Sequence, residues 1–240
     1  MIGDPAAFII SSLFLIVALF VAIPLHELGH AAAAVMLGDP SPRNRGVFRW
    51  GPRAFLNPYG VVAVFLLNVG FGNPVPVNEA RLGSTWRKLG WALGGPAANL
   101  GAAIIFGALV RVLLSVGGQP SPYTLSQTPL GFVATIIYAC FFLNLSIFAF
   151  QLIPLPGLDG WRVVEILFRR RHPAFFYRVA GSTQTIWMVA VFALILGPYL
   201  LHFSLLAAVM GIVYQPASTA ILGTCSGYVT LNPCPFLGLT

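Results

Sequence analysis

A long apolar segment near the amino terminus is the feature that most constrains the fold of this chain. Residues 6–37 are almost entirely apolar, apart from Pro24 and a group of ionisable residues at His26, Glu27 and His30. A helix needs about 20 apolar residues to cross a bilayer, and this segment is longer. It is therefore predicted to span a membrane and to carry the ionisable group within it.

The composition of the whole chain excludes a soluble protein. Hydrophobic residues make up 58% of the sequence and charged residues 8%, whereas about 25% charged is usual in soluble domains. A soluble surface needs more charge than this. Most of the chain is therefore expected to lie in a lipid bilayer.

The net charge of +7 could suggest nucleic acid, but the placement of the basic residues favours a membrane. Twelve of the thirteen lie in two connecting regions, 38–88 and 162–178, whereas the loop 117–130 has no charge. An excess of Lys and Arg in alternate connections marks the cytoplasmic side. The chain is predicted to be a multi-pass cell-membrane protein whose arginines contact anionic lipid headgroups, with no nucleic acid as partner.

Further apolar segments predict the rest of the fold. Residues 89–116 and 131–153 are each long enough to span a bilayer. Residues 185–213 form either one broken span or a span and a returning half-helix. The expected fold class is an all-α, polytopic membrane helical bundle of four or five spans.

One domain and a tail account for the whole length. Residues 1–214 are assigned to a membrane-embedded domain and residues 215–240 to a C-terminal tail. Cys225 and Cys234 in this tail can form a disulfide only if the tail faces an oxidising compartment.

The segment 59–78 is expected to be irregular. Its first ten residues are apolar but too few to span a bilayer comfortably, and Pro74 and Pro76 exclude a regular helix after them. Non-helical backbone at membrane depth survives only where protein or a water-filled cavity shields it. A re-entrant element with extended backbone is therefore predicted.

The run His26-Glu27-Leu28-Gly29-His30 predicts a metal site. Residues four apart share one helix face, with Cβ atoms about 5–6 Å apart. The two histidines can therefore bind one Zn²⁺ while Glu27 acts as general base on its water. An ionisable side chain inside a bilayer costs roughly 2.5–3.5 kcal/mol, so a chance cluster without a role is disfavoured.

Two histidines leave a catalytic zinc one protein ligand short. Among the six acidic residues, Asp159 lies at the inner end of the segment 131–153, just after a Pro-x-Pro-Gly break that can turn its carboxylate toward the metal. The alternative is that Asp159 caps the helix that follows it. The residue pattern leaves both roles open.

These motifs together resemble the site-2 protease family of intramembrane zinc proteases. The resemblance covers roughly residues 15–165 and rests on four motifs in the family's order: HELGH at 26–30, GNPVPVN at 72–78, GGPAAN at 94–99 and LIPLPGLDG at 152–160. It implies that His26, His30 and Asp159 bind one zinc ion per chain and that Glu27 activates water.

The resemblance also implies where a substrate binds. The extended element is expected to hold an unwound substrate by strand addition, and Asn99 is either an interhelical hydrogen-bonding residue or part of the site. The residues assigned to substrate binding are Asn73, Pro74, Val75, Pro76, Val77 and Asn99.

One position departs from the family. An asparagine usually stands eight residues before the aspartate and is thought to steady the oxyanion, whereas this chain has Gln151. A glutamine amide donates the same hydrogen bond from a longer side chain. Gln151 is therefore assigned as the oxyanion residue, and the departure leaves a weak or inactive enzyme as an alternative.

The function that the resemblance implies is zinc-dependent hydrolysis of a peptide bond in or near the transmembrane segment of a single-span protein, with the active site toward the cytoplasm. One rival is an inactive zinc-binding relative that acts as a membrane interaction protein. The other is a metal transporter, disfavoured because only Asn99 and Asn144 add polar groups to the later spans. The length leaves no room for an appended PDZ or CBS domain, and the substrate and oligomeric state stay open.

Overall fold

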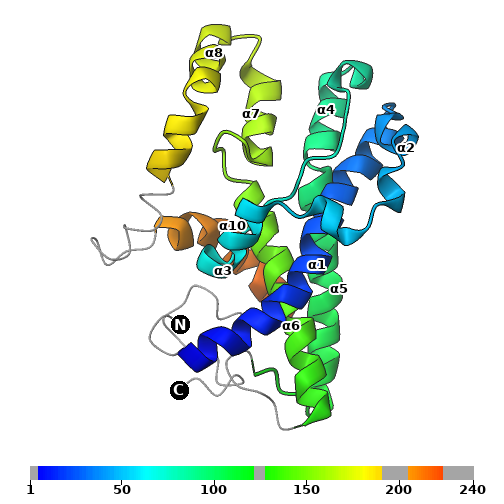
Figure 1. Ribbon diagram of the computed structural model, residues 1–240, viewed down its shortest axis with the longest axis vertical. Coiled ribbons are helices and arrows are strands. Elements are labelled where there is room, and N and C mark those ends of the chain that lie inside the picture. The colour runs from blue at the N-terminus through cyan, green and yellow to red at the C-terminus, as the bar shows by residue number, and fades with distance from the viewer. Residues whose placement is uncertain (1–4, 122–127, 191–204, 224–240) are drawn as a thin grey trace.

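The computed structural model describes residues 5–121, 128–190 and 205–223, and within these ranges every regular element is a helix (Figure 1). The expected all-α fold class is confirmed. The α-helices are α1 (Pro5–Met36), α2 (Ser41–Asn44), α3 (Pro58–Leu67), α4 (Thr85–Ala92), α5 (Gly94–Ser115), α6 (Pro129–Gln151), α7 (Asp159–Phe168), α8 (Pro173–Gly181) and α10 (Leu205–Leu222). Three short 3-10 helices lie between them: η1 (Val47–Arg49), η2 (Pro52–Phe55) and η3 (Glu79–Leu82).

Three long helices form the centre of the molecule. Among the described residues, Ile9–Met36, Gly94–Ser115 and Pro129–Gln151 are long and apolar enough to cross a membrane. These are most of α1 and the whole of α5 and α6, and each of the three packs against the other two. The predicted membrane bundle is thus confirmed, although part of the fourth apolar region, 185–213, lies outside the described residues.

Glycines allow α1 and α5 to approach closely. A Cβ built on Gly29 of α1 would lie 2.5 Å from the carbonyl oxygen of Gly94 and 2.7 Å from the Cβ of Ala98. Small residues let the backbones of membrane helices touch in this way. The GGPAAN run therefore serves to bring α5 against the face of α1 that carries the histidines.

The second predicted span begins later than expected. Residues 89–116 divide at Leu93, where α4 ends and α5 begins. Pro96 has no amide hydrogen to give and restricts the residue before it, which suits the first turn of a helix and not its interior. The chain therefore starts a new helix, and the span proper begins at Gly94.

The predicted irregular element is a short helix followed by extended backbone. Helix α3 ends at Leu67, and the capping residue after it, Asn68, has a φ of 56° in the left-handed region that terminates helices. Residues 69–78 then run without regular structure, apart from one antiparallel bridge between Gly72 and Leu56. This extended element passes beside the metal-site segment of α1.

The carboxyl-terminal part differs from expectation at one boundary. Helix α10 runs from Leu205 to Leu222, so the boundary placed between residues 214 and 215 falls inside a helix. The division into domain and tail stays a prediction. Cys225 and Cys234 lie outside the described residues.

The basic residues gather at one end of the molecule. Helices α2, α4, α7 and α8 all lie at the upper end in Figure 1, near the carboxyl-terminal end of α1 and the amino-terminal end of α5. Twelve of the thirteen basic residues belong to these helices and the connections next to them. The charge asymmetry expected from the sequence is therefore also an asymmetry in space.

Candidate metal centre

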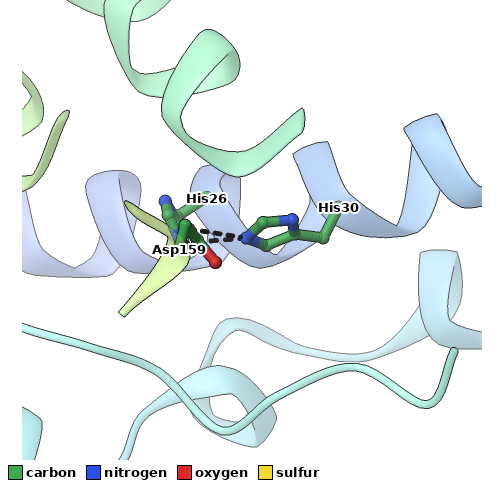
Figure 2. Close-up of side chains that lie close together, drawn as sticks. All are labelled: His26, His30 and Asp159. Atoms are coloured by element: carbon green, nitrogen blue, oxygen red, sulfur yellow. Dashed lines mark hydrogen bonds and ion pairs between the residues drawn. The ribbon is translucent and has the colours of Figure 1, made fainter. Parts of the chain in front are cut away.

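The three predicted metal ligands come together from two distant parts of the chain. His26 and His30 lie one turn apart on α1, and Asp159 is the first residue of α7 (Figure 2). The two Nε2 atoms are 3.2 Å apart, and Asp159 Oδ2 lies 3.1 Å from that of His26 and 3.0 Å from that of His30. All three side chains are buried.

Hydrogen bonds fix the tautomer of His26. A backbone carbonyl can only accept, so the 3.0 Å bond to the carbonyl of Ala22 identifies Asn99 Nδ2 as the donor. Asn99 Oδ1 therefore faces His26 Nδ1 at 2.7 Å, and Nδ1 carries the hydrogen. Asn144 supports this arrangement because its Oδ1 accepts a second bond from Asn99 Nδ2 at 2.8 Å. Nε2 of His26 is left with a lone pair directed at the site.

A backbone carbonyl fixes the tautomer of His30 as well. Its Nδ1 lies 2.9 Å from the carbonyl oxygen of Trp91, which can only accept, and 3.4 Å from the amide nitrogen of Gly95. The shorter contact decides the tautomer, so Nδ1 donates to Trp91 and Nε2 keeps a lone pair. Helix α5 approaches both rings at Gly95, where an added Cβ would collide with His30 Nε2 and lie 2.7 Å from His26 Cε1. Only glycine fits between α5 and the two imidazoles.

Three acceptor atoms therefore face one another with no hydrogen between them. Two imidazole lone pairs and a carboxylate oxygen at 3.0–3.2 Å repel each other unless a cation lies among them. Zinc bonds of about 2.0–2.1 Å in tetrahedral geometry place ligand atoms roughly 3.3 Å apart, and two nitrogens with one oxygen form a catalytic donor set with an open fourth position. The donor chemistry and spacing fit a zinc ion.

The alternative role of Asp159 as a helix cap does not match its position. The N-cap of α7 is Leu158, and Asp159 is already the first helical residue. Its Oδ2 faces the histidines, while its Oδ1 accepts a 3.4 Å hydrogen bond from Arg162 Nη1. Both carboxylate oxygens are thus engaged away from the backbone amides of α7.

The predicted general base lies next to the extended element. Glu27 is 6% exposed, and its Oε2 accepts a hydrogen bond from the amide of Val75 at 3.3 Å. Gly72 comes so close that an added Cβ would lie 2.7 Å from Oε1. Oε1 has no hydrogen-bond partner among the described residues, and this leaves it as the oxygen that can receive a proton.

Gln151 lies beside the metal ligands at the end of α6. Its side chain is buried, and its Oε1 accepts a 3.4 Å hydrogen bond from the amide of Asp159. No hydrogen bond of its Nε2 occurs within the described part of the chain. The amide group therefore keeps a donor for a substrate oxygen, and its oxyanion role stays a prediction.

The residues assigned to substrate binding differ in what they contact. Asn73 anchors the extended element, because Nδ2 donates to the carbonyl of Leu56 at 2.9 Å and Oδ1 accepts from Asn57 at 3.1 Å. Val75 is 9% exposed and packs in the core with α1 and α6. Pro74 is exposed and Pro76 is partly buried. Val77 is partly buried and packs against the hydrophobic core, and Asn99 contacts His26.

Asp39 is a buried structural residue in the connection that follows α1. It is 0% exposed, and its carboxylate accepts from the Ser41 hydroxyl and the Asn78 amide, both at 2.6 Å. Burial raises the pKa of Asp39, but these hydrogen bonds and the nearby Arg81 charge outweigh it, so its pKa lies below the ordinary value. The Asp-Pro-Ser run after α1, typical of an Asx turn, was the signal that could have revealed it.

Three curated relatives are similar to this chain over part of its length. "Putative zinc metalloprotease YwhC" of Bacillus subtilis is 33% identical over 156 residues, which cover 64% of this chain and 68% of that protein. "Putative zinc metalloprotease Rip2" of Mycobacterium tuberculosis is 30% identical over 153 residues, and its namesake in Mycolicibacterium smegmatis is 27% identical over 146. Those matches cover 60% and 59% of this chain but only 53% and 52% of the two Rip2 proteins.

Two further comparisons returned nothing. No family model matches the chain, and no solved structure matches it.

Proposed function

Because the chain belongs to the site-2 protease family of membrane-embedded zinc metalloproteases, we propose that it is a zinc-dependent intramembrane endopeptidase. Its substrates on this proposal are single-span membrane proteins, cut in or near the transmembrane segment. The cell membrane is the proposed location, and the arginine-rich end of the molecule is proposed to face the cytoplasm. The metal centre then lies toward the cytoplasmic side.

One observation carries the proposal. Three acceptor atoms from His26, His30 and Asp159 converge at 3.0–3.2 Å, with Glu27 on the same helix turn. A structural zinc site is closed by four protein ligands, whereas a catalytic site keeps one position open for water or substrate. Three ligands with an adjacent carboxylate therefore support hydrolysis.

The chain's own residues have distinct roles in the proposed reaction. A bound zinc ion supplies the Lewis acidity that makes a coordinated water reactive near neutral pH. Glu27 accepts the water proton at Oε1 while the Val75 amide holds Oε2 in place. Gln151 donates from Nε2 to the developing oxyanion. Asn99 keeps the His26 lone pair directed at the metal.

The extended element is the proposed site of substrate binding. A substrate helix hides its peptide bonds, so hydrolysis requires it to unwind, and an extended neighbour can hold the unwound strand. Pro74 and Pro76 have no amide hydrogen, so at those residues the element can only accept hydrogen bonds from substrate amides. Val75 lies in the core, so a substitution there would disturb packing as well as any contact with a substrate.

Glu27→Gln tests the proposed hydrolysis. In a purified full-length chain with a model single-span substrate, we expect cleavage to fall by about 10²–10⁴-fold, the usual contribution of a general base. The zinc content, measured by atomic absorption, should stay near one per chain. Glu79→Gln is the matched control, since it changes an exposed acid that is not one of the metal ligands. Undiminished cleavage by Glu27→Gln would reject the mechanism.

Gln151 distinguishes the enzyme from the inactive relative. We expect Gln151→Ala to lower kcat by about 10²–10³-fold through loss of an oxyanion donor, and Gln151→Asn to retain activity. Zinc binding without cleavage by the wild-type chain would instead support an inactive membrane interaction protein.

A metal transporter is less well supported, because Asn99 and Asn144 are both engaged in holding His26.

A further inference from the structure

A basic cavity of about 390 Å³ lies next to the metal centre, between α4 and α7. Four of its lining side chains are cationic and two are carboxylates: Lys88, Arg162, Arg169, Arg170, Glu79 and Glu165. Arg169 Nη1 pairs with Glu165 Oε1 at 2.9 Å, so the remaining lining charge is positive. The basic cavity therefore suits an anion.

Arg162 is held in place for such a ligand. Its guanidinium carbon lies 5.1 Å above the ring of Trp91, and its Nη1 contacts Asp159 Oδ1 at 3.4 Å, while 35% of the side chain is exposed. A cation already fixed by two contacts loses less conformational entropy when it binds a ligand. The planar guanidinium also matches the spacing of phosphate oxygens.

The basic cavity lies beside the amino-terminal end of the second span. Lys88 precedes the start of that span at Gly94 by six residues, a rise of about 9 Å along a helix at 1.5 Å per residue. The headgroup layer is roughly 5–8 Å thick on each side of a bilayer, and a long lysine side chain can reach back to it. Trp86 is 81% exposed and Tyr177 83% exposed on the neighbouring helices α4 and α8, as expected for aromatic residues at a membrane surface.

We propose that the basic cavity binds the headgroup phosphate of an anionic phospholipid. Cationic side chains supply the charge and Arg162 supplies an oriented fork of donors, while the exposed aromatic residues on α4 and α8 favour a lipid as the source of the phosphate. The proposal does not depend on the proposed proteolysis, because the metal ligands, Glu27 and Gln151 do not line the cavity.

The experiment compares two double variants that each remove two positive charges from the same two regions. Lys88→Gln with Arg170→Gln alters the lining, whereas Arg87→Gln with Arg171→Gln alters the adjacent residues that do not line the cavity. Binding of short-chain phosphatidylglycerol to the full-length zinc-loaded chain in a neutral detergent is measured by native mass spectrometry. We expect the lining variant to raise the Kd about tenfold or more and the control variant to change it less than about twofold.

Several results would overturn the proposal. Equal weakening by both double variants would mean a diffuse surface charge effect, and equal binding of phosphatidylcholine by the wild-type chain would mean no preference for anionic lipid. Binding of inorganic phosphate or glycerol 3-phosphate as tight as that of the lipid would instead identify a site for soluble phosphates. Unchanged zinc content and gel-filtration profile in both variants serve as the folding check.

Discussion

At the scale of single residues, the metal centre depends on a chain of hydrogen bonds that begins at backbone carbonyls. The carbonyl of Ala22 orients the amide of Asn99, and that amide decides which nitrogen of His26 carries its proton. The carbonyl of Trp91 does the same for His30 in one step. Since only an unprotonated imidazole nitrogen binds a metal, these partners matter as much as the ligands.

The role of Asn99 leads to a measurable expectation. Asn99→Ala removes the acceptor from His26 Nδ1, and loss of such a partner typically costs 10–100-fold in metal affinity. We expect zinc affinity, measured by competition with a chromophoric chelator, to fall by that amount. Ser146→Ala is the control, because Ser146 Oγ is buried with no hydrogen-bond partner among the described residues. Unchanged zinc affinity in Asn99→Ala would show that Asn99 serves only helix packing.

At the scale of elements, the extended element is held at three points along its length. Asn73 bonds the loop before α3, the Val75 amide bonds Glu27, and the Asn78 amide bonds Asp39 at the end of α1. The last anchor is a carboxylate whose pKa is lowered. A lowered folded-state pKa means that this carboxylate stabilises the fold above its unfolded pKa, and that the contribution is lost as pH falls through the folded value.

Asp39→Asn tests this anchor. The amide group of the new asparagine has one oxygen and one NH₂ group, so its NH₂ group would face either the Asn78 amide or the Ser41 hydroxyl, and both of these are donors. At least one hydrogen bond to a charged carboxylate is then lost, and such a bond contributes about 1.5–3 kcal/mol. We expect a lower thermal unfolding temperature near pH 7, slower substrate cleavage and normal zinc content. Ser41→Ala removes only one of these bonds and should have a smaller effect. The difference in stability between wild type and Asp39→Asn should shrink below about pH 4, and a constant difference there would contradict this account.

At the scale of the whole molecule, a bound metal would join α1 to α7, whose ligands lie 129 residues apart. A ligand that binds only the folded state stabilises it, by about 4 kcal/mol when present at 1,000 times its Kd. We expect chelation to lower the unfolding temperature and to expose the 152–158 connection to added protease. Zinc should restore both properties and magnesium should not. His30→Ala should respond weakly to chelation, whereas a chelation effect as large as in wild type would place the metal elsewhere.

The sequence alone determined the membrane bundle, the histidine pair and the neighbouring glutamate. These follow from the length of apolar segments, from the 3.6-residue period of a helix and from the high cost of ionisable groups in lipid. The residue pattern left two roles open for Asp159, and the resemblance to the site-2 protease family implied the ligand role. Proline spacing likewise indicated the extended element, although its anchors at Asn73 and Asp39 were not foreseen.

Only the tertiary structure decided which groups hold the ligands and the extended element. The tautomers of His26 and His30, the passage of α5 at Gly95 and the buried Asp39 all depend on atoms more than thirty residues away along the chain. Sequence periodicity describes which face of a helix a residue occupies. A hydrogen bond between two elements, however, requires the donor and acceptor atoms to be placed to within about half an ångström. Such distances are set by packing of the whole bundle.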